Sequence, residues 1–134
     1  MRRLSVATAV GVLALLCACE PDPEQEKESM ENQQIVDAIA ADIDRPAVGF
    51  TKVDGVYRDD ASTAQQVSFS IRCDNCDART VIDQVVEAVW TSEVRPLRTI
   101  SVSVTGPDGY EGETIVLADH EAELTERYGA RPSD

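Results

Sequence analysis

Two segments of alternating apolar and polar residues, on either side of an apolar helical segment, constrain the fold of this chain more than any other feature. Residues 67–71 and 100–104 each carry an aliphatic or aromatic side chain at every second position, which is typical of strands that bury one face. Asp77 is a good N-cap for the helix between them. The apolar residues of that helix form a band wide enough to lie flat on a sheet: Val81, Ile82, Val85, Val86, Ala88, Val89 and Trp90.

The segments before this unit predict a further helix and a further strand. Apolar residues recur at three- and four-residue spacing over residues 35–43, so we expect a helix with Ser29 as its N-cap and Pro46 as its stop. Residues 48–57 favour a strand, in which Asp54-Gly55 marks a bulge or an early turn.

The segments after the unit predict a hairpin and a last helix. Gly106-Pro107-Asp108-Gly109 favours a turn into a strand over residues 113–118. Asp119 is expected to cap a final helix, with Leu124 and Tyr128 on one face and Gly129 past its end.

The order of these elements is helix, two strands, helix, two strands, helix. It predicts a single α+β domain over residues 29–134, a two-layer sandwich with helices on one face of an antiparallel four-stranded sheet. The middle helix must cross over between the strands that flank it, on the side fixed by the right-handed rule. We therefore expect a ferredoxin-like or permuted ferredoxin-like domain.

The N-terminus has the features of an export signal. Arg2-Arg3 precede an apolar run over residues 6–16, which is too short to span a bilayer. The run ends in Leu16-Cys17-Ala18-Cys19, which resembles the lipobox of bacterial lipoproteins. That resemblance implies that residues 1–18 are a signal peptide and that Cys19 is acylated and becomes the first residue of the mature chain. We expect a lipid anchor at the extracytoplasmic face of the cell membrane.

Residues 19–28 after the anchor are acidic, contain Pro21 and Pro23, and hold nothing apolar to bury. They predict an extended tether. The whole chain has 25 Asp and Glu against 12 Lys and Arg, a formal net charge of −13. Such a chain is repelled by phosphate backbones, so nucleic acid is excluded as a partner.

Cys73 and Cys76 are the thiols that remain after Cys17 leaves with the signal and Cys19 takes the lipid. An oxidising compartment favours a disulfide between them. Redox chemistry at a helix N-terminus and binding of Cu(I) or zinc by two thiolates are the alternatives. Asp74 and Asp77 oppose a strongly activated thiolate. Strand, Cys-x-x-Cys, helix and strand together are similar to the layout of heavy-metal-associated domains, although Ser70-Ile71-Arg72 replaces the Gly-Met-x of that family.

Other candidate residues favour structural roles. His120 is expected on the surface, and Trp90 and Tyr128 in the core. The acids Asp54, Asp59 and Asp60 lack the spacing of a calcium loop. The sequence predicts no catalytic residues, no metal ligands and no cofactor.

The second half of the domain resembles short uncharacterised lipoproteins of high-GC Gram-positive bacteria. The similar segments are Ala88-Val89-Trp90, Pro96-Leu97, Ile100-Ser101-Val102 and Arg127-Tyr128-Gly129-Ala130-Arg131-Pro132. The resemblance implies location and fold, and no activity. Our first hypothesis is a lipid-anchored accessory or interaction protein without catalytic activity, whose partner is an unidentified surface protein. The alternative is a surface metal carrier or thiol-redox protein acting through Cys73 and Cys76.

Overall fold

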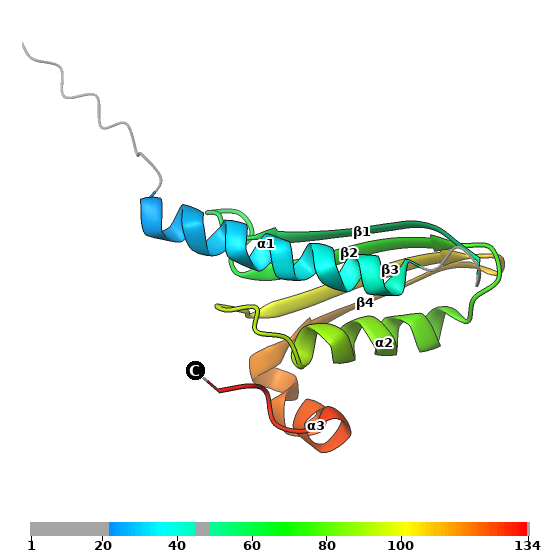
Figure 1. Cartoon of the computed structure of the whole chain (residues 1–134). Helices are drawn as coiled ribbons and strands as arrows, with labels where there is room; N and C mark the ends of the chain where they lie inside the picture. Colours follow the sequence, from blue (N-terminus) through cyan, green and yellow to red (C-terminus); the bar gives the residue numbers. More distant parts are fainter. Residues whose placement is uncertain (1–21, 45–48, 134) are drawn as a thin grey trace, which may run out of the picture.

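The computed structural model describes residues 22–44 and 49–133 of the chain. In these residues the elements follow the predicted order (Figure 1). They are α1 (Pro23–Ile43), β1 (Phe50–Arg58), β2 (Gln66–Cys73), α2 (Ala78–Trp90), β3 (Thr99–Gly106), β4 (Gly109–Val116) and α3 (Leu117–Tyr128). The predicted helix stop at Pro46 and strand start at Val48 lie outside the described residues.

The four strands form one sheet in the order β1-β2-β3-β4. β1 and β2 are antiparallel, as are β3 and β4, whereas β2 and β3 are parallel. The purely antiparallel sheet predicted from the sequence is therefore wrong, and the sheet is mixed. The reason is α2, which returns the chain from the end of β2 to the start of β3, so that both strands run the same way.

The predicted ferredoxin-like arrangement is not confirmed. The two strands joined by α2 are direct neighbours in the sheet, whereas ferredoxin-like domains contain split βαβ units, in which another strand lies between the two. The structure supports the coarser statement, an α+β domain with three helices and a four-stranded mixed sheet.

The core lies between the sheet and the helices. α1 and α2 cover one face of the sheet, and α3 packs beside α2 past the β4 edge (Figure 1). The alternation predicted for β2 and β3 is confirmed, because every second residue of both strands is buried against the helices. The predicted band of α2 is buried too, apart from half-buried Ala88. The carboxylate of Asp77 caps α2 as predicted, accepting a hydrogen bond from Thr80 N.

Helix α1 begins earlier than predicted. Asp22, not Ser29, is its N-cap, and its carboxylate accepts a hydrogen bond from Glu24 N at 3.0 Å. Pro23 occupies the first helical position, where its fixed φ favours a helix start, and acids in the first turn complement the helix dipole. Residues 23–28 are therefore helical, and the extended form predicted for them is wrong.

Polar side chains hold the first half of α1 on the domain. Buried Asn32 donates from Nδ2 to the carbonyl oxygen of Arg95 at 2.7 Å and accepts from Arg95 N at 3.0 Å. Gln33 likewise forms two hydrogen bonds with β1: its Nε2 donates to the carbonyl oxygen of Gly55, and its Oε1 accepts from Tyr57 N. These contacts explain how a helix start with no apolar face is ordered.

Gly55 lets α1 approach β1 closely. It pairs regularly with Phe69, so the predicted bulge or turn at Asp54-Gly55 is wrong, and the register shift lies between Phe50 and Lys52 instead. A Cβ atom at Gly55 would come within 2.6 Å of Val36 Cγ1 and 2.8 Å of Phe69 Cε1. Both neighbours are buried. The missing side chain is therefore what brings the helix and strand together.

The last hairpin and helix also differ from prediction at their ends. The turn is confirmed, but β4 begins directly at Gly109 and ends at Val116, so α3 starts before Asp119. The residue before α3 is Val116, which offers no side-chain cap, and Asp119 lies in the first turn. Gly129 terminates α3 as predicted, with a φ of 83°.

Candidate functional site

The predicted cysteine pair lies at the corner between β2 and α2. Cys73 is the last residue of β2 and is buried, while Cys76 is half-buried in the loop before α2. Their sulfur atoms lie at disulfide distance, and their Cα atoms are 5.9 Å apart, within the range of protein disulfides. The sequence located this pair correctly.

Backbone and capping hydrogen bonds fix this corner. Asp74 N donates to the carbonyl oxygen of Gly49 at 2.9 Å, which ties the loop to the chain just before β1. The Asp77 carboxylate accepts from Thr80 N at 2.8 Å and from Thr80 Oγ1 at 2.9 Å. Those bonds hold the pKa of Asp77 below its usual value. Because an ionised carboxylate already occupies the start of α2, the helix dipole is not free to stabilise a thiolate on Cys76.

A cavity of about 480 Å³ adjoins the cysteine pair. It lies between the C-terminal part of α1 and the first half of α2, and its lining includes Cys76, Phe50, Asp42 and Gln84. In the described part of the chain, no group of three or more His, Cys, Asp or Glu side chains gathers to hold a metal ion. The two sulfur atoms therefore have no third His, Cys, Asp or Glu side chain of the described residues grouped with them as a metal site.

The second candidate is the face of the sheet that the helices leave uncovered, which we call the open face. The register places there the side chains that alternate with the core residues. In this set, Lys52, Asp54, Val56 and Arg58 come from β1, Gln66, Ser68, Ser70 and Arg72 from β2, Thr99, Ser101, Ser103 and Thr105 from β3, and Tyr110, Gly112, Thr114 and Val116 from β4. None of them is buried.

Small hydroxyl residues make the middle of the open face flat. Neighbouring strands pair Ser68 with Ser101 and Ser70 with Ser103. Four hydroxyls are engaged locally. Ser103 Oγ donates to the carbonyl oxygen of Phe69, Ser101 Oγ lies 3.3 Å from Thr114 Oγ1, and Ser68 Oγ accepts from Gln66 Nε2 at 2.8 Å. A surface of this kind presents little relief to a partner.

Tyr110 is the large aromatic residue of the open face and is 73 % exposed. Its ring lies across Gly112, because a Cβ built at Gly112 would come within 2.6 Å of the Tyr110 hydroxyl oxygen and 3.1 Å of Cζ. Gly112 thus leaves space for the ring to lie along the sheet. Val56 and Val116 add exposed apolar area on the same face.

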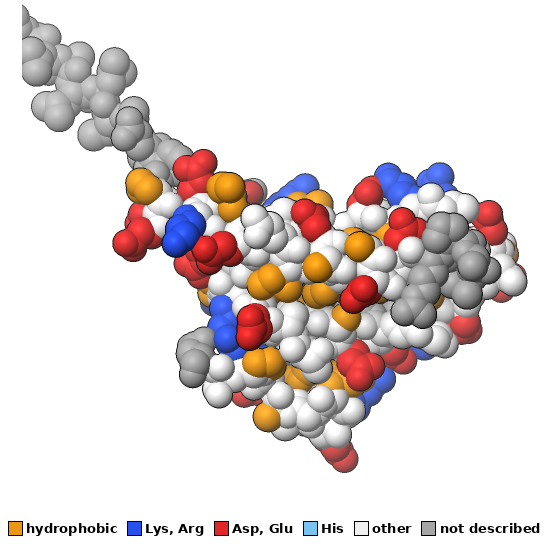
Figure 2. Space-filling model, in the orientation of Figure 1, with side chains coloured by type: hydrophobic (Ala, Val, Ile, Leu, Met, Phe, Trp, Pro, Cys, Tyr) orange, Lys and Arg blue, Asp and Glu red, His pale blue; other side chains and the backbone are white. Residues whose placement is uncertain are grey.

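The open face also differs from the rest of the molecule in charge. It carries Lys52, Arg58 and Arg72 with Asp54 as its one acid, and Lys52 Nζ lies 2.9 Å from Asp54 Oδ2. Asp and Glu side chains are spread over the opposite, helix-covered side (Figure 2). A chain of strong negative charge therefore has one face with a positive balance.

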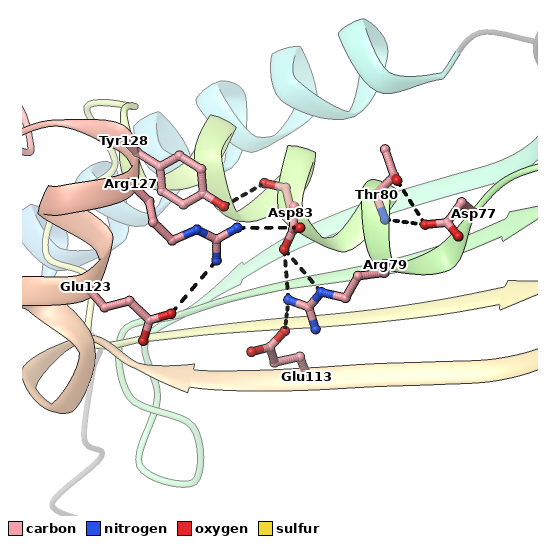
Figure 3. A network of polar contacts seen from close by, with 8 residues as sticks. All are labelled: Asp77, Arg79, Thr80, Asp83, Glu113, Glu123, Arg127 and Tyr128. Carbon is pink, nitrogen blue, oxygen red and sulfur yellow. Dashed lines mark hydrogen bonds and ion pairs between the residues drawn. The ribbon is translucent and has the colours of Figure 1, made fainter.

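A third cluster joins α2, β4 and α3 (Figure 3). Arg79 Nη2 lies 2.8 Å from Asp83 Oδ1 and 2.6 Å from Glu113 Oε2, and Asp83 Oδ2 lies 3.5 Å from Arg127 Nη2. Arg79 lowers the pKa of Asp83, and these carboxylates raise the pKa of Arg79. Charges of both signs are paired here, so the cluster fastens three elements together and leaves no group poised for chemistry.

The remaining predicted residues have the structural roles expected of them. His120 is exposed, and its Nδ1 lies 3.5 Å from Glu123 Oε2. Trp90 is buried, and Tyr128 is packed against the core. Asp60 accepts hydrogen bonds from Ser62 and Thr63 within its own turn, which lowers its pKa.

The predicted signal peptide and the lipidation site Cys19 lie outside the described residues. No helix in residues 22–44 and 49–133 is long and apolar enough to cross a membrane. No protein-family model matches the chain, and neither does any curated protein or solved structure.

Sequence reasoning missed the open face. Some of its members were seen only as the polar partners of buried residues, and Tyr110 was not singled out. The sequence did carry a signal for this face. Ser and Thr occupy alternate positions of both central strands, where a solvated sheet face usually carries charged side chains.

Proposed function

We propose that the protein is a lipid-anchored, extracytoplasmic interaction protein without catalytic activity, and that it binds a surface protein through the open face. The observation that carries this proposal is the flat, uncovered sheet face with Tyr110 lying on it. The lipobox-like segment ending at Cys19 supports the location. A partner is expected to present acidic and aromatic side chains.

The chemistry of the face supports binding to a protein. Tyrosine combines a large apolar ring with a hydroxyl and is enriched at protein interfaces, as is arginine. Tyr110 loses little conformational freedom on binding, because Gly112 already gives its ring a place along the sheet. Arg58 and Arg72 complement an acidic partner and would speed its encounter.

Site-specific photo-crosslinking in cells tests the interaction. A photoreactive residue at Thr114, on the β4 side of the open face, should give a discrete crosslinked product, and the same residue at exposed Glu121 on α3 should not. Tyr110→Ser should abolish the product at Thr114 without changing the melting temperature, because the Tyr110 side chain is 73 % exposed. Equal products from both positions, or a product that survives Tyr110→Ser, would refute the proposal.

Membrane attachment has its own test. Cys19→Ala should leave the protein unprocessed or release it from membranes, and Cys17→Ala should change neither. A Cys19→Ala protein that stays membrane-bound at mature size contradicts the anchor.

A second candidate function rests on the cysteine corner. Cys76 lines a cavity of about 480 Å³, which gives a small molecule or a metal access to one of two adjacent sulfurs. In this alternative the protein is a metal carrier or thiol-redox protein acting through Cys73 and Cys76. Titration of free thiols in protein purified without reductant distinguishes the two functions: titratable thiols support the alternative, and their absence supports the first proposal.

A further inference from the structure

Two arginines meet where the loop before β3 faces the C-terminal segment. Arg95 and Arg131 line one cavity of about 490 Å³ together with Glu28, Pro96 and Leu97. Neither arginine lies on the open face, and the cavity is independent of the proposed interaction surface. It is also distinct from the cavity beside Cys76.

Arg131 is half-buried, and two contacts hold its guanidinium in place. It lies over the ring of Trp90, with Cζ 5.9 Å from the ring centroid, and its Nη2 donates to the carbonyl oxygen of Val94. Trp90 Nε1 in turn donates to the carbonyl oxygen of Gly129 at 2.9 Å. These contacts fix both the ring and the direction of the guanidinium, which is the preorganisation that a binding site needs.

Arg131 has donor capacity that the described residues do not use. Its Nη1 is buried without a hydrogen-bond partner, and no described carboxylate forms an ion pair with the side chain. Burial lowers the pKa of Arg131, and the positive charge of Arg95 lowers it further. A buried donor left unsatisfied is costly, and burial disfavours the charged form of a guanidinium. An anion bound at Arg131 would relieve both penalties.

The surroundings continue into a second cavity. It has a volume of about 200 Å³, shares Leu97 and Arg131 with the first, and is also lined by Trp90, Leu117, Ala118 and Glu121. Arg131 therefore stands at the junction of two cavities, and the second offers apolar side chains beside one carboxylate. A guanidinium fork fits a carboxylate with two parallel hydrogen bonds.

We propose that this double cavity binds a small organic acid, with its carboxylate at Arg131 and Arg95 and its apolar body against Leu97, Leu117 and Trp90. Nothing in this proposal depends on the interaction surface or on the cysteine pair. Glu28 lines the first cavity and Glu121 the second, so both carboxylates weaken the binding of an anion there.

Trp90 is the one tryptophan of the chain, so its fluorescence reports on this site alone. Titration of the Cys19→Ala protein with hexanoate should give a saturable fluorescence change in the millimolar range. Acetate, which lacks the apolar body, should bind more weakly, and hexanamide, which lacks the charge, should give no saturable change. Hexanoate without a saturable change, or hexanamide binding as tightly as hexanoate, would overturn the proposal.

Variants separate this site from general electrostatics. Arg131→Gln should weaken hexanoate binding about tenfold or more, because a charge-assisted hydrogen-bonded pair is lost. Glu28→Gln removes one exposed negative charge from the cavity and should tighten binding several-fold. Asp108→Asn makes the same charge change in the turn at the far end of β3 and should leave binding unchanged.

The Glu28→Gln result stands even where Arg131→Gln fails to fold, because Glu28 lies exposed on α1. Tightening by Glu28→Gln but not by Asp108→Asn supports the site. Equal effects of both variants, or no effect of Glu28→Gln, would refute it.

Discussion

Replacing Gly55 with alanine tests how closely α1 packs on the sheet. The new methyl group would lie within 2.6 Å of Val36 Cγ1 and 2.8 Å of Phe69 Cε1, distances that real Cβ atoms do not adopt. Val36 is fully buried and Phe69 is 2 % exposed, so neither side chain can turn into solvent. The helix, the strand or both must shift.

The size of the effect follows from two opposing terms. Overpacking of a core costs about 1–3 kcal/mol. Alanine also reduces the entropy of the unfolded chain relative to glycine, which returns about 0.4–1 kcal/mol. We therefore expect a net loss of about 1–2 kcal/mol in the free energy of unfolding. For a domain of this size, that corresponds to a melting temperature lower by about 5–10 °C.

Gly112→Ala is the matched control, because it makes the same substitution in another strand. There the new Cβ meets the hydroxyl end of Tyr110, which is exposed and can swing away. We expect a change within about 0.5 kcal/mol. Urea denaturation followed by circular dichroism measures both variants. If Gly55→Ala unfolds at the same urea concentration as Gly112→Ala, the close packing of α1 on β1 is disproved.

A double variant locates the clash. Val36→Ala alone should destabilise the domain by opening a cavity. Combined with Gly55→Ala, it should cost less than the sum of the two single changes, because the methyl group at position 55 takes up part of the space that Val36 vacates. Strict additivity would show that the cost of Gly55→Ala arises elsewhere.

Two further predictions concern the cysteine corner and the charged cluster. Intact protein taken from cells without reductant should show the two-proton mass deficit of a Cys73–Cys76 bond, and changing both residues to serine should lower stability by at most about 2 kcal/mol, because so short a loop removes little entropy from the unfolded chain. The pKa of Asp83 is lowered chiefly by Arg79. The ionised carboxylate therefore stabilises the fold at pH values above the pKa of Asp in the unfolded chain, about 3.9. This contribution is lost as the pH falls through the lower pKa that Asp83 has in the folded protein. Asp83→Asn should therefore flatten the fall in the urea midpoint below about pH 4, whereas Asp108→Asn in an exposed turn should not; identical profiles for both variants would contradict the role of the Arg79 pair.

The sequence predicted the elements well because their patterns are local. Alternation in β2 and β3 and the apolar band of α2 each lie within a dozen residues. Strand pairing depends instead on which elements meet in space, and β2 and β3 carry the same alternation whichever direction they pair in. The parallel direction of β2 and β3 follows from the crossover through α2. The sequence did indicate that crossover, but the prediction of an antiparallel sheet did not take it into account.

Contacts between distant residues were beyond sequence reasoning. Asn32 holds the backbone of Arg95, 63 positions away, and nothing near Asn32 predicts that bond. The early start of α1 was missed for a different reason: Asp22, Pro23 and the acids after them are a local signal for a helix start, but the lack of apolar residues there was interpreted as an extended tether. The cysteine pair was found because its spacing is a motif, whereas Arg95 and Arg131 lie far apart in the chain and share a cavity only in the fold.

The early start of α1 has a consequence for how an anchored domain would stand on a membrane. Asp22 is three residues from Cys19, a span of at most about 11 Å, so a lipid on Cys19 would be joined almost directly to a helix about 32 Å long. Such a helix acts as a stiff arm, and its tilt sets the tilt of the whole domain. Because α1 lies along the sheet (Figure 1), an upright arm would turn the open face sideways, toward proteins held in the same membrane.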